Sequence, residues 1–151
     1  MNKTEKTLIS GFTGTTFMTA SSALSSLLGQ DFREPAHLTT MVERLVPFLS
    51  KKAQTIIGWA GHYGMGFVFA AVYVELWERG EVKHTLKNGF ILGGISGLVG
   101  ILIWKGTFRA HPLPPSMNYL TFYLQRIPAH IVFAVFATLA YQLIKDQEMK
   151  K

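Results

Sequence analysis

The amino-acid sequence predicts an all-α membrane protein: a four-transmembrane-helix bundle with an amphipathic interfacial helix between the first and second spans. Only 16% of its 151 residues are charged, while 48% are hydrophobic. Soluble domains carry about 25% charged residues, and the mean hydropathy of this chain is positive. Four segments also reach the roughly 20 mostly apolar residues that cross a bilayer. We therefore expect a single membrane domain over residues 1–151.

The predicted spans cover residues 8–28, 54–77, 87–105 and 119–144. The first has no charged residue but is rich in Gly, Ser, Thr and Ala. It follows Lys3 and Lys6, as the apolar region of a signal peptide follows its basic start. It is longer than the apolar region of a signal peptide, which has about 7–15 residues, and no A-x-A cleavage site follows it. We expect it to be retained. The second span is charged only at Glu75, and the third lies between Lys87 and Lys105.

A shorter pattern precedes the second span. Over residues 36–50, apolar side chains recur at spacings of three and four: Leu38, Met41, Val42, Leu45, Phe48 and Leu49. Glu43 and Arg44 fall between them. This pattern predicts an amphipathic helix that is too short and too polar to span, and that lies in the interface. We expect Pro47 to break or kink it.

Lysine and arginine residues predict the orientation. With four spans, both termini and the middle loop share one side, which carries eight such residues against six on the other. We therefore expect both termini in the cytoplasm. The net charge of +6 does not indicate nucleic-acid binding, because the basic residues lie at the ends of apolar runs, where they contact lipid headgroups. The expected partner is the lipid bilayer.

Glycines mark close helix contacts, because helices in lipid associate through backbone approach and hydrogen bonds. The third span carries a stripe of them: Gly89, Gly93, Gly97 and Gly100. The stripe predicts a tight helix contact, either inside the bundle or between the copies of a homo-oligomer.

Three ionisable residues lie inside the predicted spans: His62, Arg126 and His130. Such side chains are costly in a bilayer and are therefore functional candidates. Counted from the span ends at about 1.5 Å per residue, all three lie roughly 10–17 Å below the same surface and can meet. Tyr63 and Gln125 add hydrogen-bonding groups at similar depth. These residues form the candidate ligand-binding site, and no catalytic residue is assigned.

Several interpretations of this site stay open. The residues could form a cationic pocket for an anion or acidic lipid headgroup, two axial ligands for a haem, a proton relay, or interhelical bonds that only stabilise the bundle. Whether a metal is bound stays unknown. The chain has no cysteine ligand, and the loop residues His37 and His111 could join Glu34 or Glu43 in a metal site on the outer face, although no ligand spacing is diagnostic of zinc. Motifs of soluble enzymes are absent, which favours a non-enzymatic role.

The order of these features resembles the YagU-like and related uncharacterised families of small bacterial inner-membrane proteins. The resemblance covers about residues 11–141. It rests on Glu34-Pro35, Gly61-His62-Tyr63-Gly64-Met65-Gly66, the glycine stripe before Trp104, and Pro128-Ala129-His130. It implies a four-span protein of the bacterial inner membrane, in which histidines recur in the second and fourth spans, at His62 and His130 here. Such families have no settled biochemical activity.

We therefore expect a non-enzymatic membrane protein that binds or passes a small anionic or lipidic ligand. Arg126 would supply a fixed charge at the pocket, and His62 and His130 would supply pH-sensitive hydrogen bonds. The alternatives are a structural or accessory subunit of a larger membrane complex and a b-type haem-binding membrane protein.

Overall fold

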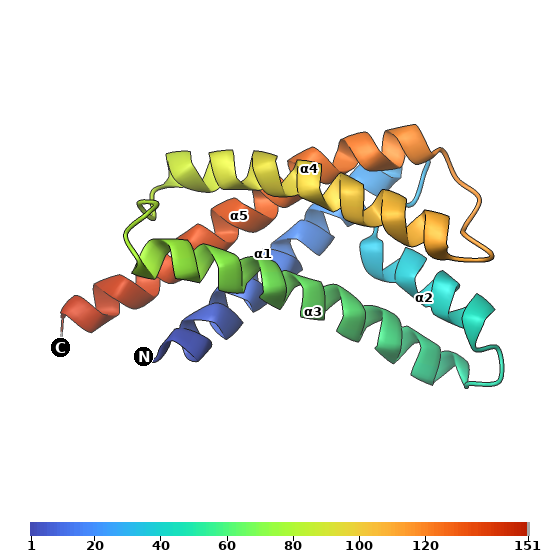
Figure 1. The fold of residues 1–151 in the computed structure, drawn as a ribbon, viewed down its shortest axis with the longest axis horizontal. Coiled ribbons are helices and arrows are strands. Elements are labelled where there is room, and N and C mark those ends of the chain that lie inside the picture. Colours follow the sequence, from blue (N-terminus) through green and yellow to red (C-terminus); the bar gives the residue numbers. More distant parts are fainter. Residues whose placement is uncertain (151) are drawn as a thin grey trace.

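The computed structural model describes residues 1–150, and its regular structure there is entirely helical (Figure 1). The all-α prediction is confirmed for this part of the chain. The elements are α1 (Lys3–Ser25), the short 3-10 helix η1 (Ser26–Leu28), α2 (Glu34–Leu45), α3 (Lys51–Glu78), α4 (Leu86–Ala110) and α5 (Tyr119–Met149).

Side-chain caps begin four of the five α-helices. Asn2 accepts a hydrogen bond from the backbone N–H of Glu5 and completes a capping box at the start of α1. Each of the helices α3, α4 and α5 begins with a side chain that accepts from a backbone N–H three residues later, and these caps are Ser50, Thr85 and Asn118. Each cap satisfies a backbone N–H that lacks a partner within the helix. The start of α2 has no such cap and instead carries Pro35 in its first turn, where a missing N–H costs nothing.

Helix α2 is displaced from its predicted range of 36–50. It begins two residues earlier, because a proline fits the first turn of a helix. It ends at Leu45, because the residue before Pro47 is disfavoured in the helical conformation. Residues 46–50 therefore form a turn rather than the last turn of an amphipathic helix. α1 also begins earlier than the predicted first span, at Lys3.

The helices pack in an open row. The pairs in close contact are α4 with α5, α5 with α1, α1 with α3, and α3 with α2. α3 and α4 are joined by a short turn and meet in the half near it, where the Tyr73 hydroxyl lies 2.5 Å from the Ser96 hydroxyl. Beyond that contact they diverge, and α2 lies at the wide end (Figure 1).

The glycine stripe lies in the α4–α5 contact. A Cβ atom on Gly93 would lie 2.5 Å from the Cα of Ile131, and one on Gly97 would lie 2.6 Å from the Cα of Ile127. The two backbones therefore approach more closely than any side chain on α4 would permit. These glycines serve a contact within one chain, so they are not free to pack against a second copy.

The start of α1, the end of α5 and the α3–α4 turn lie at one end of the molecule (Figure 1). Ion pairs hold them together there: the Met1 ammonium group is 2.7 Å from Glu148, and Lys6 Nζ is 3.0 Å from Glu78 and 3.1 Å from Glu148. The opposite end carries α2 and the proline-rich connection between α4 and α5.

Three of the helices, α3, α4 and α5, are long and apolar enough to cross a membrane by length and composition. This agrees with a multi-pass membrane protein. α1 has 23 residues but lacks the hydropathy of the other three, because Ser, Thr and Gly make up much of its sequence. Length and composition therefore support three spans, and the role of α1 has to be argued from its packing.

Candidate functional site

A cavity of about 370 Å³ lies between the diverging halves of α3 and α4. Its walls are mostly apolar: Met18, Leu38, Met65, Phe69, Ile103, Trp104 and Phe133. Three titratable side chains also line it, namely Glu34, His62 and His130. Partly exposed Met65 of α3 and Ile103 of α4 lie at its edge, so the cavity opens sideways between these two helices.

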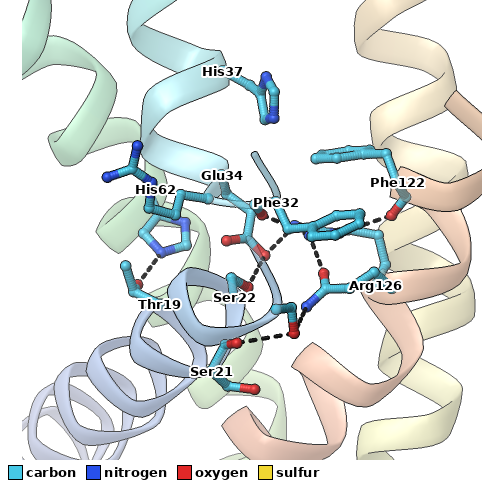
Figure 2. A network of polar contacts seen from close by, with 12 residues as sticks. Thr19, Ser21, Ser22, Phe32, Glu34, His37, His62, Phe122 and Arg126 are labelled. Carbon is cyan, nitrogen blue, oxygen red and sulfur yellow. Dashed lines mark hydrogen bonds and ion pairs between the residues drawn. The ribbon is translucent and has the colours of Figure 1, made fainter. Parts of the chain in front are cut away.

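His62 reaches the cavity from the inner face of α3. Its side chain is buried, and its Nε2 lies 2.8 Å from the hydroxyl of Thr19 on α1 (Figure 2). Gly58 and Gly66 lie one turn away on either side of it and contact Thr39 and Thr15. The glycines thus bring α2 and α1 close to α3, which buries the histidine between them.

His130 enters the same cavity from α5. Gly100 of α4 makes room for it, since a Cβ atom there would lie 2.5 Å from His130 Nε2. Phe69 contacts the imidazole edge-on, with the ring centroids 4.9 Å apart. The Nδ1 atom is buried and has no hydrogen-bond partner among residues 1–150. This histidine therefore retains unused hydrogen-bonding capacity.

Arg126 is fully buried and forms an ion pair with Glu34, the first residue of α2 (Figure 2). It also donates to the carbonyl oxygen of Phe32 at 2.8 Å and to that of Phe122 at 3.3 Å. Ser22 donates to Glu34 Oε1 at 3.3 Å. The second oxygen, Oε2, is buried without a partner in the described part of the chain. The pair anchors α2 and the loop before it to α5.

The five predicted site residues do not all meet. His62 and His130 line one cavity, whereas Arg126 does not line it and contacts Glu34, which does. Tyr63 lies outside: its hydroxyl is 2.9 Å from that of Thr16 and its ring stacks on Phe12. Gln125 accepts a hydrogen bond from Arg126 and donates to the Ser25 hydroxyl at 3.3 Å.

Glu34 is the residue that sequence reasoning does not place in the site. From the sequence it is only a possible loop ligand for a metal and part of a family motif. The missed signal is electrostatic: a buried guanidinium needs an opposite charge, and Glu34 is the acidic residue next to the turn that enters α2. Because it neutralises Arg126, the cavity lacks the free positive charge that the sequence suggests.

Of the two histidines expected in loops, His37 lies within α2 and His111 follows the last residue of α4, and both contact backbone oxygens. His37 Nε2 lies 2.8 Å from the carbonyl oxygen of Asp31, and His111 Nε2 lies 3.0 Å from that of Met41. Burial lowers the pKa of His37, and hydrogen bonds from Arg33 lower the pKa of Asp31. No group of three or more potential metal ligands occurs within residues 1–150. The two contacts tie α2 to the segment before it and to the end of α4.

Comparison of the chain with protein-family models, with curated proteins and with solved structures finds no match. The cavity and the groups around it are consequently the basis for inferring function.

Proposed function

We propose that this chain is a non-enzymatic, four-span membrane protein that holds a small lipidic molecule in the cavity between α3 and α4. The observation that carries the proposal is the cavity itself. Ligand sites are concave, mostly apolar and equipped with a few convergent polar groups, and this one combines an apolar wall with Glu34, His62 and His130.

The assignment of α1 as a fourth span is supported by how its polar residues are distributed. Ser10, Thr15 and Ser22 are fully buried against the other helices, whereas large apolar residues such as Phe12 and Leu24 are exposed. A soluble helix has the reverse arrangement. In lipid, small and hydroxyl-bearing residues form the helix contacts and apolar side chains face the acyl chains. With its polar side chains in helix contacts and its apolar side chains facing lipid, a weakly hydrophobic helix can span the membrane.

We also propose a location in the bacterial inner membrane with both termini in the cytoplasm. The excess of Lys and Arg on the terminal side supports this orientation. The resemblance to YagU-like families supports the membrane, and His62 and His130, the two residues that the resemblance picks out, line the same cavity.

Of the two ligand classes left open by the sequence, a lipidic one is favoured over an anionic one. The charge of Arg126 is balanced by Glu34, which stands between it and the cavity. An accessory role through glycine faces has less support, because the α4 stripe is already used against α5.

Two glycines of α3 provide a matched test. Gly61 lines the cavity and a Cβ atom there would have only Leu38 nearby, while a Cβ atom on Gly64, outside the cavity, would have no neighbour within 4 Å. Gly61→Leu should fill the cavity and remove molecules that co-purify with the wild type, as measured by mass spectrometry of organic extracts. Gly64→Leu should retain them.

Other outcomes would contradict the proposal. Equal retention of the co-purifying molecule by both variants would place it on the outer surface. A Soret band that disappears in His62→Ala or His130→Ala would make this a haem protein instead. A stoichiometric protein partner recovered with an empty cavity would favour the accessory-subunit interpretation.

A further inference from the structure

We propose that a groove at the end of α4 away from the α3–α4 turn binds the head group of an anionic phospholipid. The groove has a volume of about 520 Å³ and lies between the last two turns of α4 and the first turns of α5. Its lining consists of Lys105, Gly106, Phe108, Arg109, Tyr119 and Tyr123. None of these residues lines the cavity between α3 and α4, so the two sites are distinct.

The groove lies at the depth of the lipid head groups. α4 has no charged residue between Lys87 and Lys105, and a helix rises about 27 Å over that distance. The hydrocarbon core of a bilayer is about 30 Å thick, so the two lysines mark its two boundaries. Arg109 lies one turn beyond Lys105, among the head groups. Tyr119 and Tyr123 begin α5 at the same boundary, where tyrosine is enriched.

The α4 side of the groove carries two positive charges. Lys105 and Arg109 are exposed and four residues apart, so they share one face of the helix. Neither forms an ion pair with any of residues 1–150. Acidic residues are also absent from the surrounding sequence, because residues 82–145 contain no Asp or Glu. Within the described chain, this positive charge is therefore available to an anion.

The α5 side of the groove is aromatic. The rings of Tyr119 and Tyr123 stack with their centroids 6.1 Å apart, and buried Phe108 contacts Tyr119 edge-on at 5.4 Å. About one turn nearer the centre of the bilayer, Leu102 is exposed on the same side of α4 as Lys105. A soluble anion would use only the basic side chains. A phospholipid can also lay an acyl chain against the exposed leucine, and we therefore assign the groove to a lipid.

Two phospholipids with the same acyl chains test the site. Phosphatidylglycerol carries a net negative charge and phosphatidylcholine carries none, and native mass spectrometry of the detergent-purified full chain would measure both affinities. We expect phosphatidylglycerol to bind about tenfold more tightly, because two basic side chains attract its head group. Inorganic phosphate at an equal concentration should not displace it, because phosphate has no acyl chain to bury.

A matched pair of double variants locates the effect. Lys105→Gln with Arg109→Gln removes both charges from the groove, so the preference for phosphatidylglycerol should fall about tenfold. Lys51→Gln with Lys52→Gln removes the same charge at the same end of the molecule (Figure 1), from lysines that do not line the groove. This control should keep the preference. All four side chains are exposed, so both variants should fold.

Three outcomes would overturn the proposal. Equal binding of the two lipids by the wild type would remove the site. An equal loss of preference in both double variants would mean that basic charge at this end attracts lipid without the groove. Displacement of phosphatidylglycerol by inorganic phosphate would make the ligand a soluble anion. None of these results bears on the cavity, which the variants Gly61→Leu and Gly64→Leu test separately.

Discussion

Among individual side chains, Glu34 and Arg126 form the most deeply buried ion pair within residues 1–150. Both residues are almost completely buried, and the interior repays the loss of hydration only if the two charges stay together. The pair also joins the first turn of α2 to the first third of α5, two elements that are distant in sequence. Together with the contact between Gly58 and Thr39, it holds α2 where Glu34 and Leu38 line the cavity.

The pair should behave as a unit in mutagenesis. Arg126→Gln or Glu34→Gln alone leaves one buried charge without its partner and should cost about 3–5 kcal/mol of stability. The double substitution should cost clearly less than the sum, because neither charge remains. Detergent-induced unfolding followed by circular dichroism measures all four proteins. Single variants as stable as the wild type would indicate that the pair is hydrated.

The ion pair changes the role that the sequence suggests for Arg126. An intramembrane arginine is expected to be the fixed charge of the pocket, because a single residue in a span has no visible partner in the sequence. Its partner lies far earlier in the chain, outside every predicted span, and only the fold brings the two together. The histidines are easier to place, since depth along two helices of known rise puts His62 and His130 at one level.

Among the helices, α4 depends on its glycines more than on its apolar residues. Large apolar side chains of α4 are exposed, including Phe90, Ile95, Leu98 and Leu102. The face that meets α5 consists mainly of glycines. The close approach predicted from glycine spacing is present, and it lies within the chain. The four-residue period is sufficient for this prediction because it keeps one face of a helix free of side chains.

Two nearby glycine positions on α4 separate packing from helix propensity. Gly97→Ala should push α4 away from the backbone of α5 and cost about 1–3 kcal/mol. The new Cβ atom of Gly94→Ala would meet no atom within 4 Å, so this change should be neutral or stabilising by up to about 1 kcal/mol, because alanine favours the helix. Thermal unfolding in detergent measures both. Equal effects would show that α4 does not pack on α5 through this face.

At the scale of the whole chain, the helices whose position depends only on apolar composition could be predicted from the sequence. Apolar length predicts α3, α4 and α5, and capping residues and prolines explain most of their ends. The break expected at Pro47 is present, and α2 ends at Leu45. The predicted range of 36–50 is too long because the apolar periodicity continues past Pro47, although the helical backbone cannot. The cavity could not be predicted, because it results from the divergence of α3 and α4, which no local pattern records.

The proposed topology can be tested without background labelling, because the chain has no cysteine. Single cysteines at Thr4, Glu81 and Ser116, all exposed, would be treated with a membrane-impermeant maleimide on intact cells and on inverted vesicles. Thr4→Cys and Glu81→Cys should react only in inverted vesicles, and Ser116→Cys only in intact cells. Labelling of Thr4→Cys from the outside would mean that α1 does not span.

The lining residues Met65 of α3 and Ile103 of α4 are partly exposed, so the cavity opens sideways between these two helices. In the proposed bilayer, a ligand would then arrive by diffusion within the membrane plane. Each additional CH₂ in its tail favours partition from water into lipid by about 0.8 kcal/mol. When affinity is calculated from the ligand concentration in water, it should therefore rise with tail length. When it is calculated from the mole fraction of ligand in the lipid, it should barely change. Selectivity would then depend on the head group alone.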